Sequence, residues 1–587
     1  MVLSRPPRAS ARTKCLAALC VAVGLASGCR PPSPTTPAAS APPPRLLITI
    51  VVDQLPAWLA ETRWPALPAD GGIARLRREG LTVRELRYAH AVTDTAPGHA
   101  ALYTGATPRE TGIFANEVLG DDGKPRSILL DETTHVVDVG AEAGPRPGSS
   151  LARLRLPTLA DALVAAAPDA RVYSFSLKDR GALFGAGRHP TAALWLDVAG
   201  DAFATSTAFP AAPAWARPLC DRAAVAAARA AGWTLSADDV AWVAAHAETP
   251  DDQAGEGDLA GLGRVFPHVV GSTKAMRATP LGDRVLFALA GAALEKIGAA
   301  RDAAPALLAL SLSSHDYIAH VFGPHSWEAW AADLELDRAL AELLAQADRA
   351  VGPDGYAVML TSDHGGAWLP EVAPATAGLH CPDSNTSSKV RGDHAQRSCA
   401  PRRRVSPPEV VGTLEAALGA ELGTGPWIAG FAEPLIYLTP RGRGLSGGAR
   451  DTMLAAAAAA LKPLGVAQIV DTRAPRRWPC PSAEADDESH DAYLCEAIDP
   501  SGPGDLYLEV FEGNFFEADL VPGFGMSHGT PYLYDRAVPL LVRAPGRVPQ
   551  GATRDAPVSF RAFSRTAASL LGVPPLSNLA GAETLVR

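Results

Sequence analysis

The segment Arg45-Leu46-Leu47-Ile48-Thr49-Ile50-Val51-Val52-Asp53 opens the part of the chain that is organised into regular apolar runs. A short run of apolar and β-branched residues that ends in a carboxylate is typical of a buried parallel strand. Three later segments are similar apolar runs that are each followed by charged residues, namely residues 171–176, 306–313 and 356–361. In open α/β sheets ligands bind beyond the carboxyl ends of the strands, so the four segments predict one shared site.

Two of these predicted strands are followed by Asp/His pairs. Asp316 and His320 are four residues apart, so on a helix they share one face and suit a zinc ligand pair, although such pairs are also common on solvated helices. Asp363 and His364 come directly after a strand, and the two glycines that follow permit the turn that adjacent ligands need. The alternative for Asp363 is a helix cap.

Two further residues complete a set of oxygen and nitrogen ligands. Asp53 ends the first strand, and His528 lies in the glycine-containing run Gly-Met-Ser-His-Gly near the end of the chain. A set without a thiolate suits two catalytic zinc ions with open positions, with manganese or iron as alternatives. Two metals about 4 Å apart can clamp both oxygens of an in-line phosphoryl displacement. The predicted ligands are Asp53, Asp316, His320, Asp363, His364 and His528.

Thr95 is the candidate nucleophile. Pro97 suits the first turn of a helix, so Thr95 is predicted to lie at a helix N-terminus, where an anion is favoured. Coordination to a metal would also make its hydroxyl a better nucleophile. The alternative is a threonine that only caps the helix.

The run Thr-Ala-Pro-Gly-His-Ala-Ala-Leu-Tyr-Thr-Gly (residues 95–105), together with the predicted ligands, resembles the alkaline phosphatase superfamily. The resemblance extends from Asp53 to His528. It implies an α/β fold with a mainly parallel central sheet flanked by helices, and a metal-dependent phosphoryl-transfer site in which Thr95 is also a metal ligand.

Asn116, Lys178 and Arg180 narrow this resemblance to the phosphate-irrepressible alkaline phosphatases, which use a threonine nucleophile. In that family the matching residues contact the phosphate oxygens or the bound water network. The resemblance implies a monomeric periplasmic enzyme that acts on small phosphate monoesters. Two zinc ions, Lys178 and Arg180 would also match the charge of a dianionic monoester.

Three other activities would match parts of the sequence. The related phosphodiesterases and nucleotide pyrophosphatases keep the asparagine but lack the Lys-x-Arg pair, and they remain the main alternative. Sulfatases need a Cys or Ser in the place of Thr95 and an Arg four residues later, where this chain has His99. A serine esterase using Ser527 would match Gly-x-Ser-x-Gly, but no histidine follows His528 in the chain.

The N-terminus predicts export. A basic segment precedes an apolar run that is too short to span a bilayer, and residues 26–29 resemble a bacterial lipoprotein cleavage site. We expect a signal peptide over residues 1–28, lipidation at Cys29 and a Pro-rich linker to residue 45. Because Ala26 replaces the usual leucine, ordinary signal cleavage and soluble export is the alternative. Membrane contact is expected only through the lipid.

The composition indicates a soluble globular protein. The net charge is −10, and without the four basic residues of the predicted signal it is −14, which argues against general nucleic-acid binding. Cys381 with Cys399, and Cys480 with Cys495, are plausible disulfides in an oxidising compartment, and Cys220 is left as a free thiol.

The site residues also predict the domain organisation. One catalytic domain is expected over residues 46–587, with insertions at about 201–299 and 371–520 that contain no site motif and shape the substrate mouth.

Overall fold

The computed structural model describes the chain in seven segments. The predicted signal peptide, Cys29 and the Cys381–Cys399 pair lie outside them. Cys480 and Cys495 form the predicted disulfide, and Cys220 is a buried free thiol. The described residues are 43–300, 304–372, 403–473, 480, 490–499, 501–517 and 520–587.

Five adjacent parallel strands form the centre of a 12-stranded sheet, and all four predicted strands are among them. Their order across the sheet is β11-β1-β10-β7-β8. This order brings the carboxyl ends of four site-bearing strands to one edge of the sheet. The strands are β1 (Leu46–Val52), β7 (Arg171–Ser176), β8 (Ala192–Asp197), β10 (Ala306–Leu312) and β11 (Tyr356–Thr361).

The sheet is mixed, because antiparallel strands extend its parallel centre on both sides. On one side β18 (Ala537–Arg543) pairs antiparallel with both β11 and β2 (Leu81–Arg87). On the other, β9 (Ala202–Ser206) pairs antiparallel with β8. Antiparallel edge strands are common on large α/β sheets. The outer strands are β5 (Leu130–Asp138), β6 (Pro147–Ser149), β19 (Ala552–Arg554) and β20 (Val558–Ser559).

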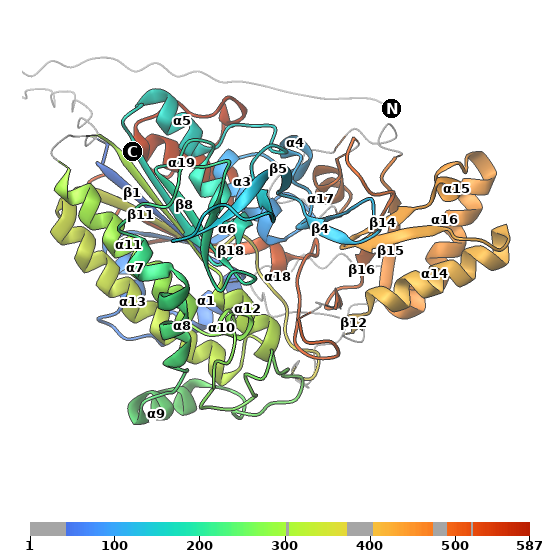
Figure 1. Ribbon diagram of the computed structural model, residues 1–587, viewed down its shortest axis with the longest axis horizontal. Helices are drawn as coiled ribbons and strands as arrows, with labels where there is room; N and C mark the ends of the chain where they lie inside the picture. Colours follow the sequence, from blue (N-terminus) through green and yellow to red (C-terminus); the bar gives the residue numbers. More distant parts are fainter. Residues whose placement is uncertain are drawn as a thin grey trace, which may run out of the picture. The chain divides into compact units, whose positions relative to one another are not determined.

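Both faces of the sheet are buried under helices (Figure 1). Successive side chains of β1 point to opposite faces: Ile48 and Ile50 belong to one apolar core, Leu47 and Val51 to the other. The first core includes α11 (Leu281–Ala299) and α13 (Trp327–Val351). The second includes α3 (Thr95–Thr104), α6 (Asp179–Ala186) and α19 (Arg561–Leu571).

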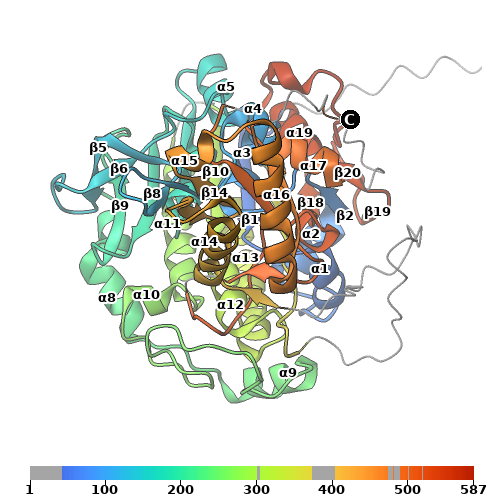
Figure 2. The same cartoon turned by 90° about the vertical axis from the view of Figure 1, so that its right-hand side faces the viewer.

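A separate four-stranded sheet lies within residues 371–520, where an insertion was expected. Its order is β13-β14-β16-β15, and two helices, α14 and α16, pack beside it (Figure 2). The apolar side chains of this sheet and of the two helices form their own core. Residues 201–299, the other expected insertion, are instead part of the main fold, because β9 belongs to the central sheet and α11 packs on β10 and β7. The elements are β13 (Ile428–Ala432), β14 (Leu435–Leu438), β15 (Val466–Asp471), β16 (Leu506–Val510), α14 (Pro407–Leu422) and α16 (Gly447–Leu461).

Short helices and hairpins complete the described chain, and none of its helices is long and apolar enough to cross a membrane. The helices are α1 (Ala57–Arg63), α2 (Gly72–Glu79), α4 (Pro108–Thr111), α5 (Leu159–Ala166), α7 (Arg217–Cys220), α8 (Arg222–Ala230), α9 (Ala237–His246), α10 (Thr273–Met276), α12 (Ser314–Phe322), α15 (Pro440–Arg443), α17 (His490–Ala497) and α18 (Leu533–Arg536), with 3₁₀ turns at Lys462–Leu464 and Ser577–Leu579. The short strands are β3 (Glu117–Leu119), β4 (Pro125–Ser127), β12 (Arg404–Val405) and β17 (Phe515–Phe516).

Candidate active site

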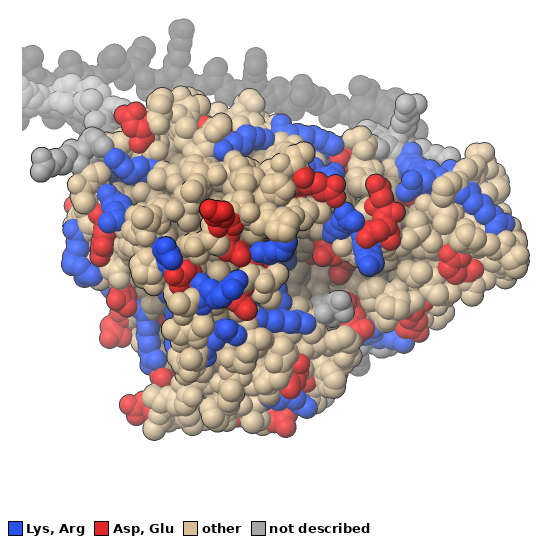
Figure 3. All heavy atoms as spheres, viewed as in Figure 1, with Lys and Arg blue, Asp and Glu red and all other residues tan. Residues whose placement is uncertain are grey.

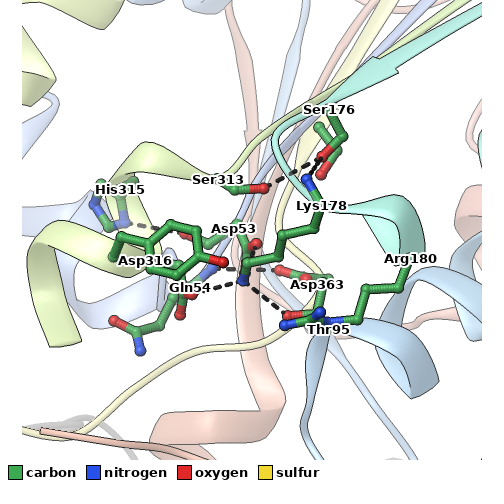
Figure 4. A network of polar contacts seen from close by, with 12 residues as sticks. Asp53, Gln54, Thr95, Ser176, Lys178, Arg180, Ser313, His315, Asp316 and Asp363 are labelled. Atoms are coloured by element: carbon green, nitrogen blue, oxygen red, sulfur yellow. Dashed lines mark hydrogen bonds and ion pairs between the residues drawn. The ribbon is translucent and has the colours of Figure 1, made fainter. Parts of the chain in front are cut away.

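The predicted site residues meet at the carboxyl edge of the parallel strands (Figure 4). Asp53 follows β1 and Asp363 follows β11. Asp316 lies in the first turn of α12, just after β10, and Lys178 caps α6 after β7. Because these strands are neighbours in the sheet, residues more than 300 positions apart in sequence come into contact. An example is the hydrogen bond that the backbone N–H of Gln54 donates to the Asp363 carboxylate.

Asp53, Asp363 and His364 form the first ligand group, in which one atom of each lies within 4.8 Å of the others. His364 Nε2 is 3.3 Å from Asp53 Oδ1 and 3.7 Å from Asp363 Oδ2. All three side chains are fully buried. Asp53 Oδ1 and His364 Nε2 are buried without a hydrogen-bond partner, which is costly for buried polar atoms unless a cation binds them.

Asp316, His320 and His528 form the second group, with the same spacing limit of 4.8 Å. His320 Nε2 is 3.2 Å and His528 Nε2 3.5 Å from Asp316 Oδ1. The first of these pairs is the predicted pair on one face of a helix, here α12. His528 reaches the group from a loop just before α18.

The three histidines are oriented in the same way. Nδ1 lies 2.6 Å from the Met526 carbonyl in His320, 2.9 Å from the Gly365 carbonyl in His364 and 2.9 Å from the Thr93 carbonyl in His528. An Nδ1–H that donates to a carbonyl leaves Nε2 as a lone-pair donor, which is the usual arrangement of metal-binding histidines. The donor atoms of both groups therefore fit divalent transition metals.

The charges in and around the second group favour a cation there. Burial alone raises the pKa of Asp316, but His320 and Lys178 outweigh burial and hold it well below its usual value. Burial lowers the pKa of His528, but the carboxylates of Asp316 and Asp94 raise it well above the ordinary value. The carboxylates of Asp316 and Asp94 thus favour positive charge on the groups around them.

Thr95 is the first residue of α3 and is 1% exposed. The N-cap is Asp94, so the alternative in which Thr95 serves only as the cap is wrong. Thr95 Oγ1 is 3.1 Å from Lys178 Nζ. A Cβ at Gly98 would lie 2.2 Å from the Asp363 carbonyl oxygen, so glycine there allows α3 to approach the first ligand group closely.

Lys178 and Arg180 are both directed toward Thr95 (Figure 4). Lys178 Nζ lies 2.7 Å from Asp53 and 2.6 Å from Asp316, so its ammonium joins the two ligand groups. Burial lowers the pKa of Lys178, but these two carboxylates raise it above its ordinary value.

Arg180 and Asn116 complete the surroundings of Thr95. Arg180 Nε is buried without a hydrogen-bond partner in the described part of the chain, and the Asp179 carboxylate is 4.0 Å from its guanidinium. Asn116 Oδ1 accepts a 2.8 Å hydrogen bond from the Ala96 amide, next to Thr95, which leaves its NH₂ group as a donor.

Three residues that lie in the site were not predicted from the sequence. His99 Nδ1 lies 2.9 Å from the Thr95 carbonyl and 3.0 Å from Asp363 Oδ2. Asp94 lies 3.2 Å from His528 Nδ1, and Tyr317 stacks under Lys178, with Nζ 5.0 Å from the ring centre. Only His99 could have been identified from the sequence, because it lies one helical turn after Thr95 and therefore on the same face of the helix.

Ser527 lacks the partner that a serine nucleophile requires. Both ring nitrogens of the adjacent His528 are engaged, with the Thr93 carbonyl and with Asp316. Within the described part of the chain no hydrogen bond joins Ser527 to a histidine, which a serine esterase needs as its base.

On the face of the molecule shown in Figure 3, acidic and basic side chains are interspersed. Surface charge on that face is therefore mixed. The concentrated charge lies in the buried site, where Lys178 is 4% exposed and Asp53 is 0% exposed.

Comparisons with known proteins agree with this geometry. Residues 47–377 match the family model described as type I phosphodiesterase/nucleotide pyrophosphatase. The alkaline phosphatase PafA of Elizabethkingia meningoseptica is 30% identical over 337 residues, which cover 56% of this chain and 60% of that protein. The alkaline phosphatase PhoK of a Sphingomonas species is 29% identical over 511 residues, 86% of this chain and 84% of PhoK.

A solved structure shows the same fold. The crystal structure of wild-type alkaline phosphatase PafA superposes with a TM-score of 0.76 at 23% identity, covering 93% of this chain and 99% of PafA. The α/β fold expected from the sequence is thereby confirmed. The chain belongs to the type I phosphodiesterase/nucleotide pyrophosphatase family, within the alkaline phosphatase superfamily.

Proposed function

We propose that the protein is a metal-dependent phosphomonoester hydrolase that acts through a covalent phosphothreonine at Thr95 and two metal ions, with zinc as the favoured metal. One observation carries the proposal: two buried ligand groups flank a buried threonine at a helix N-terminus, and Lys178 contacts both groups and the threonine. The names of PafA and PhoK as alkaline phosphatases support it.

The residues around Thr95 supply the groups that bind a phosphoryl ester. Lys178 and Arg180 are cations directed at the nucleophile, and Asn116 offers amide donors beside the Ala96 peptide. Charge-assisted hydrogen bonds from these groups would hold the non-bridging phosphate oxygens. The N-terminus of α3 adds a favourable dipole for the same anion.

In the first step Thr95 Oγ1 attacks phosphorus, the bond to the ester oxygen breaks, and the alcohol leaves after taking up a proton. In the second step water attacks the phosphothreonine, which restores Thr95 and releases inorganic phosphate. Asp53, Asp363 and His364 would hold one metal beside Thr95, and Asp316, His320 and His528 the other. When bound, the metals would lower the pKa of the attacking hydroxyl or water and neutralise the leaving oxygen.

Phosphodiester hydrolysis is the second candidate, because the matching family model is described as a phosphodiesterase. The two cations distinguish the candidates. A monoester is a dianion, whereas a diester carries one charge less and needs room for a second substituent. Lys178 together with Arg180 suits the more highly charged substrate.

A rate comparison on metal-analysed enzyme tests the proposal. We expect about two metal ions per chain, with a higher kcat/KM for an aryl phosphate monoester than for the matching diester or sulfate ester. A preference for the diester would contradict the monoesterase assignment, and full activity without metal would contradict the site.

We also propose that the enzyme is exported to the periplasm or cell envelope, anchored by a lipid at Cys29 and monomeric. The Cys480–Cys495 disulfide supports an oxidising compartment. Labelled palmitate should enter the wild-type protein but not Cys29→Ser. A soluble, unlabelled wild-type product would support ordinary signal cleavage instead.

A further inference from the structure

Arg277, which directly follows α10, is connected to the cations of the candidate active site through one side chain. Its Nη1 donates a 2.9 Å hydrogen bond to the hydroxyl of Tyr317, and its Cζ is 4.4 Å from the centre of that ring. Lys178 Nζ is 5.0 Å from the centre of the same ring. Lys178 in turn lies 3.1 Å from Thr95 Oγ1. A continuous path of contacts therefore joins Arg277 to the candidate nucleophile.

The local structure fixes where this arginine lies. Tyr317 comes directly after Asp316 at the start of α12, so it stays at the carboxyl edge of the parallel strands. Arg277 is the C-cap of α10, which is part of residues 201–299. That segment was expected to shape the substrate mouth, and it contributes a cation next to the site.

The charge of Arg277 is not matched by an acidic partner. Among the described residues its guanidinium makes one hydrogen bond, to Tyr317, and no ion pair. The residue is half-buried, and its Nε is buried without a hydrogen-bond partner. Lys178, by contrast, pairs with both Asp53 and Asp316. A partly buried charge without a counter-charge is unfavourable, so an anion that binds there would be stabilised.

Arg180 and Arg277 suit different parts of a substrate. Arg180 is directed toward Thr95 and would hold the phosphoryl group under the proposed function (Figure 4). Arg277 contacts Tyr317 rather than Thr95, so its donors would meet a part of the substrate beyond the phosphoryl group. Because Nη1 is occupied by the tyrosine hydroxyl, Nη2 is the donor that such a group would meet first.

We propose that Arg277, held in place by Tyr317, binds a second anionic group on the alcohol part of the substrate. The preferred substrates would then be phosphate monoesters of alcohols that carry a carboxylate or another phosphate, which are the groups that a guanidinium recognises best. This inference rests on the proposed phosphomonoesterase function and names a substrate class for the same site. Arg277 is assigned to specificity and takes no part in the phosphoryl-transfer steps.

Two esters that differ in one group test the proposal. 3-Phosphoglycerate carries a carboxylate where glycerol 3-phosphate carries a hydroxymethyl group. Arg277→Met should lower kcat/KM for 3-phosphoglycerate by about 10- to 100-fold, as expected for the loss of one hydrogen bond from a charged donor. For glycerol 3-phosphate it should stay within about twofold of the wild-type value. Because both enzymes are measured on both esters, any difference in the chemical reactivity of the esters cancels.

Two further variants separate charge from structure. Lys274→Met removes a charge at an exposed position on the same helix, α10, and should leave both values unchanged. Arg277→Lys should recover part of the loss, because lysine restores the charge without the planar donors.

The two proposals fail in different ways. Equal losses on the two esters in Arg277→Met, or no loss on either, would overturn the inference and leave the proposed function in place, because Arg277 would then have only a structural role. If wild-type enzyme with its metals bound hydrolysed neither ester, the proposed function would be contradicted, and this inference with it.

Discussion

Replacing Lys178 and Arg180 by methionine should convert the preference for monoesters into near indifference. Lys178 Nζ is 3.1 Å from Thr95 Oγ1, and Arg180 Nε has no hydrogen-bond partner in the buried site. Under the proposed function both would donate to the additional charge that distinguishes a monoester from a diester. Methionine keeps much of the side-chain length and removes the charge.

The expected loss follows from the strength of these contacts. A hydrogen bond from a charged donor contributes about 1.5–3 kcal/mol, so two of them correspond to a decrease in monoester kcat/KM of about 10²- to 10⁴-fold. The diester has one charge fewer, and we expect its kcat/KM to fall by about tenfold or less.

Steady-state kinetics on a paired aryl monoester and diester measure the two losses. Lys178 also contacts Asp53 and Asp316, so the metal content of each variant must be determined alongside. Arg180→Met alone lacks this complication and should retain both metals. Lys296→Met, at an exposed position, is the charge-loss control. Equal losses for the two esters in the double variant would refute this account of the preference.

Three further outcomes are expected. Thr95→Ala should lose at least about 10³-fold in phosphatase turnover while elemental analysis still finds its metals; wild-type turnover would exclude Thr95 as nucleophile. His320→Ala and His528→Ala should each lower the metal content toward one ion per chain, and unchanged content in both would contradict the division into two groups. In the smaller sheet, the pKa of Asp471 is lowered, because Arg450, at 2.5 Å, outweighs burial. An ion pair that lowers the pKa of a carboxyl in the folded protein stabilises that protein only above the pKa of the same carboxyl in the unfolded state. Arg450→Met should therefore lower the free energy of urea unfolding by about 1 kcal/mol at pH 7 and leave it unchanged near pH 2. A difference that persists in acid would contradict the ion-pair explanation.

The centre of the fold could be predicted because its strands are buried on both faces. Continuous apolar runs of parallel strands are visible in sequence, and each ends at a polar residue such as Asp53 or Asp363. The antiparallel additions could not be predicted from such runs. The run at β18 is as apolar as β1, and only its pairing with β11 and β2 reveals its direction.

The candidate site shows the same limit. The six residues predicted as ligands, five of them from positions after strands and His528 from a glycine-containing loop, make up the two groups that could hold a metal. Nothing in the sequence indicated that Gln54, next to Asp53, has a left-handed backbone with φ of 61°. Its backbone N–H donates a hydrogen bond to Asp363 Oδ1. Such a conformation is unfavourable for a residue other than glycine and depends on the surrounding packing, which a single sequence does not contain.

The most direct test of the central claim is to identify the phosphorylated residue during turnover. The enzyme is mixed with excess labelled monoester, quenched in acid, digested and mapped by mass spectrometry. The account predicts phosphate on the peptide that contains Thr95, at that residue, and its loss in Thr95→Ala. Phosphate on another residue, or steady turnover in Thr95→Ala, would contradict a phosphothreonine mechanism.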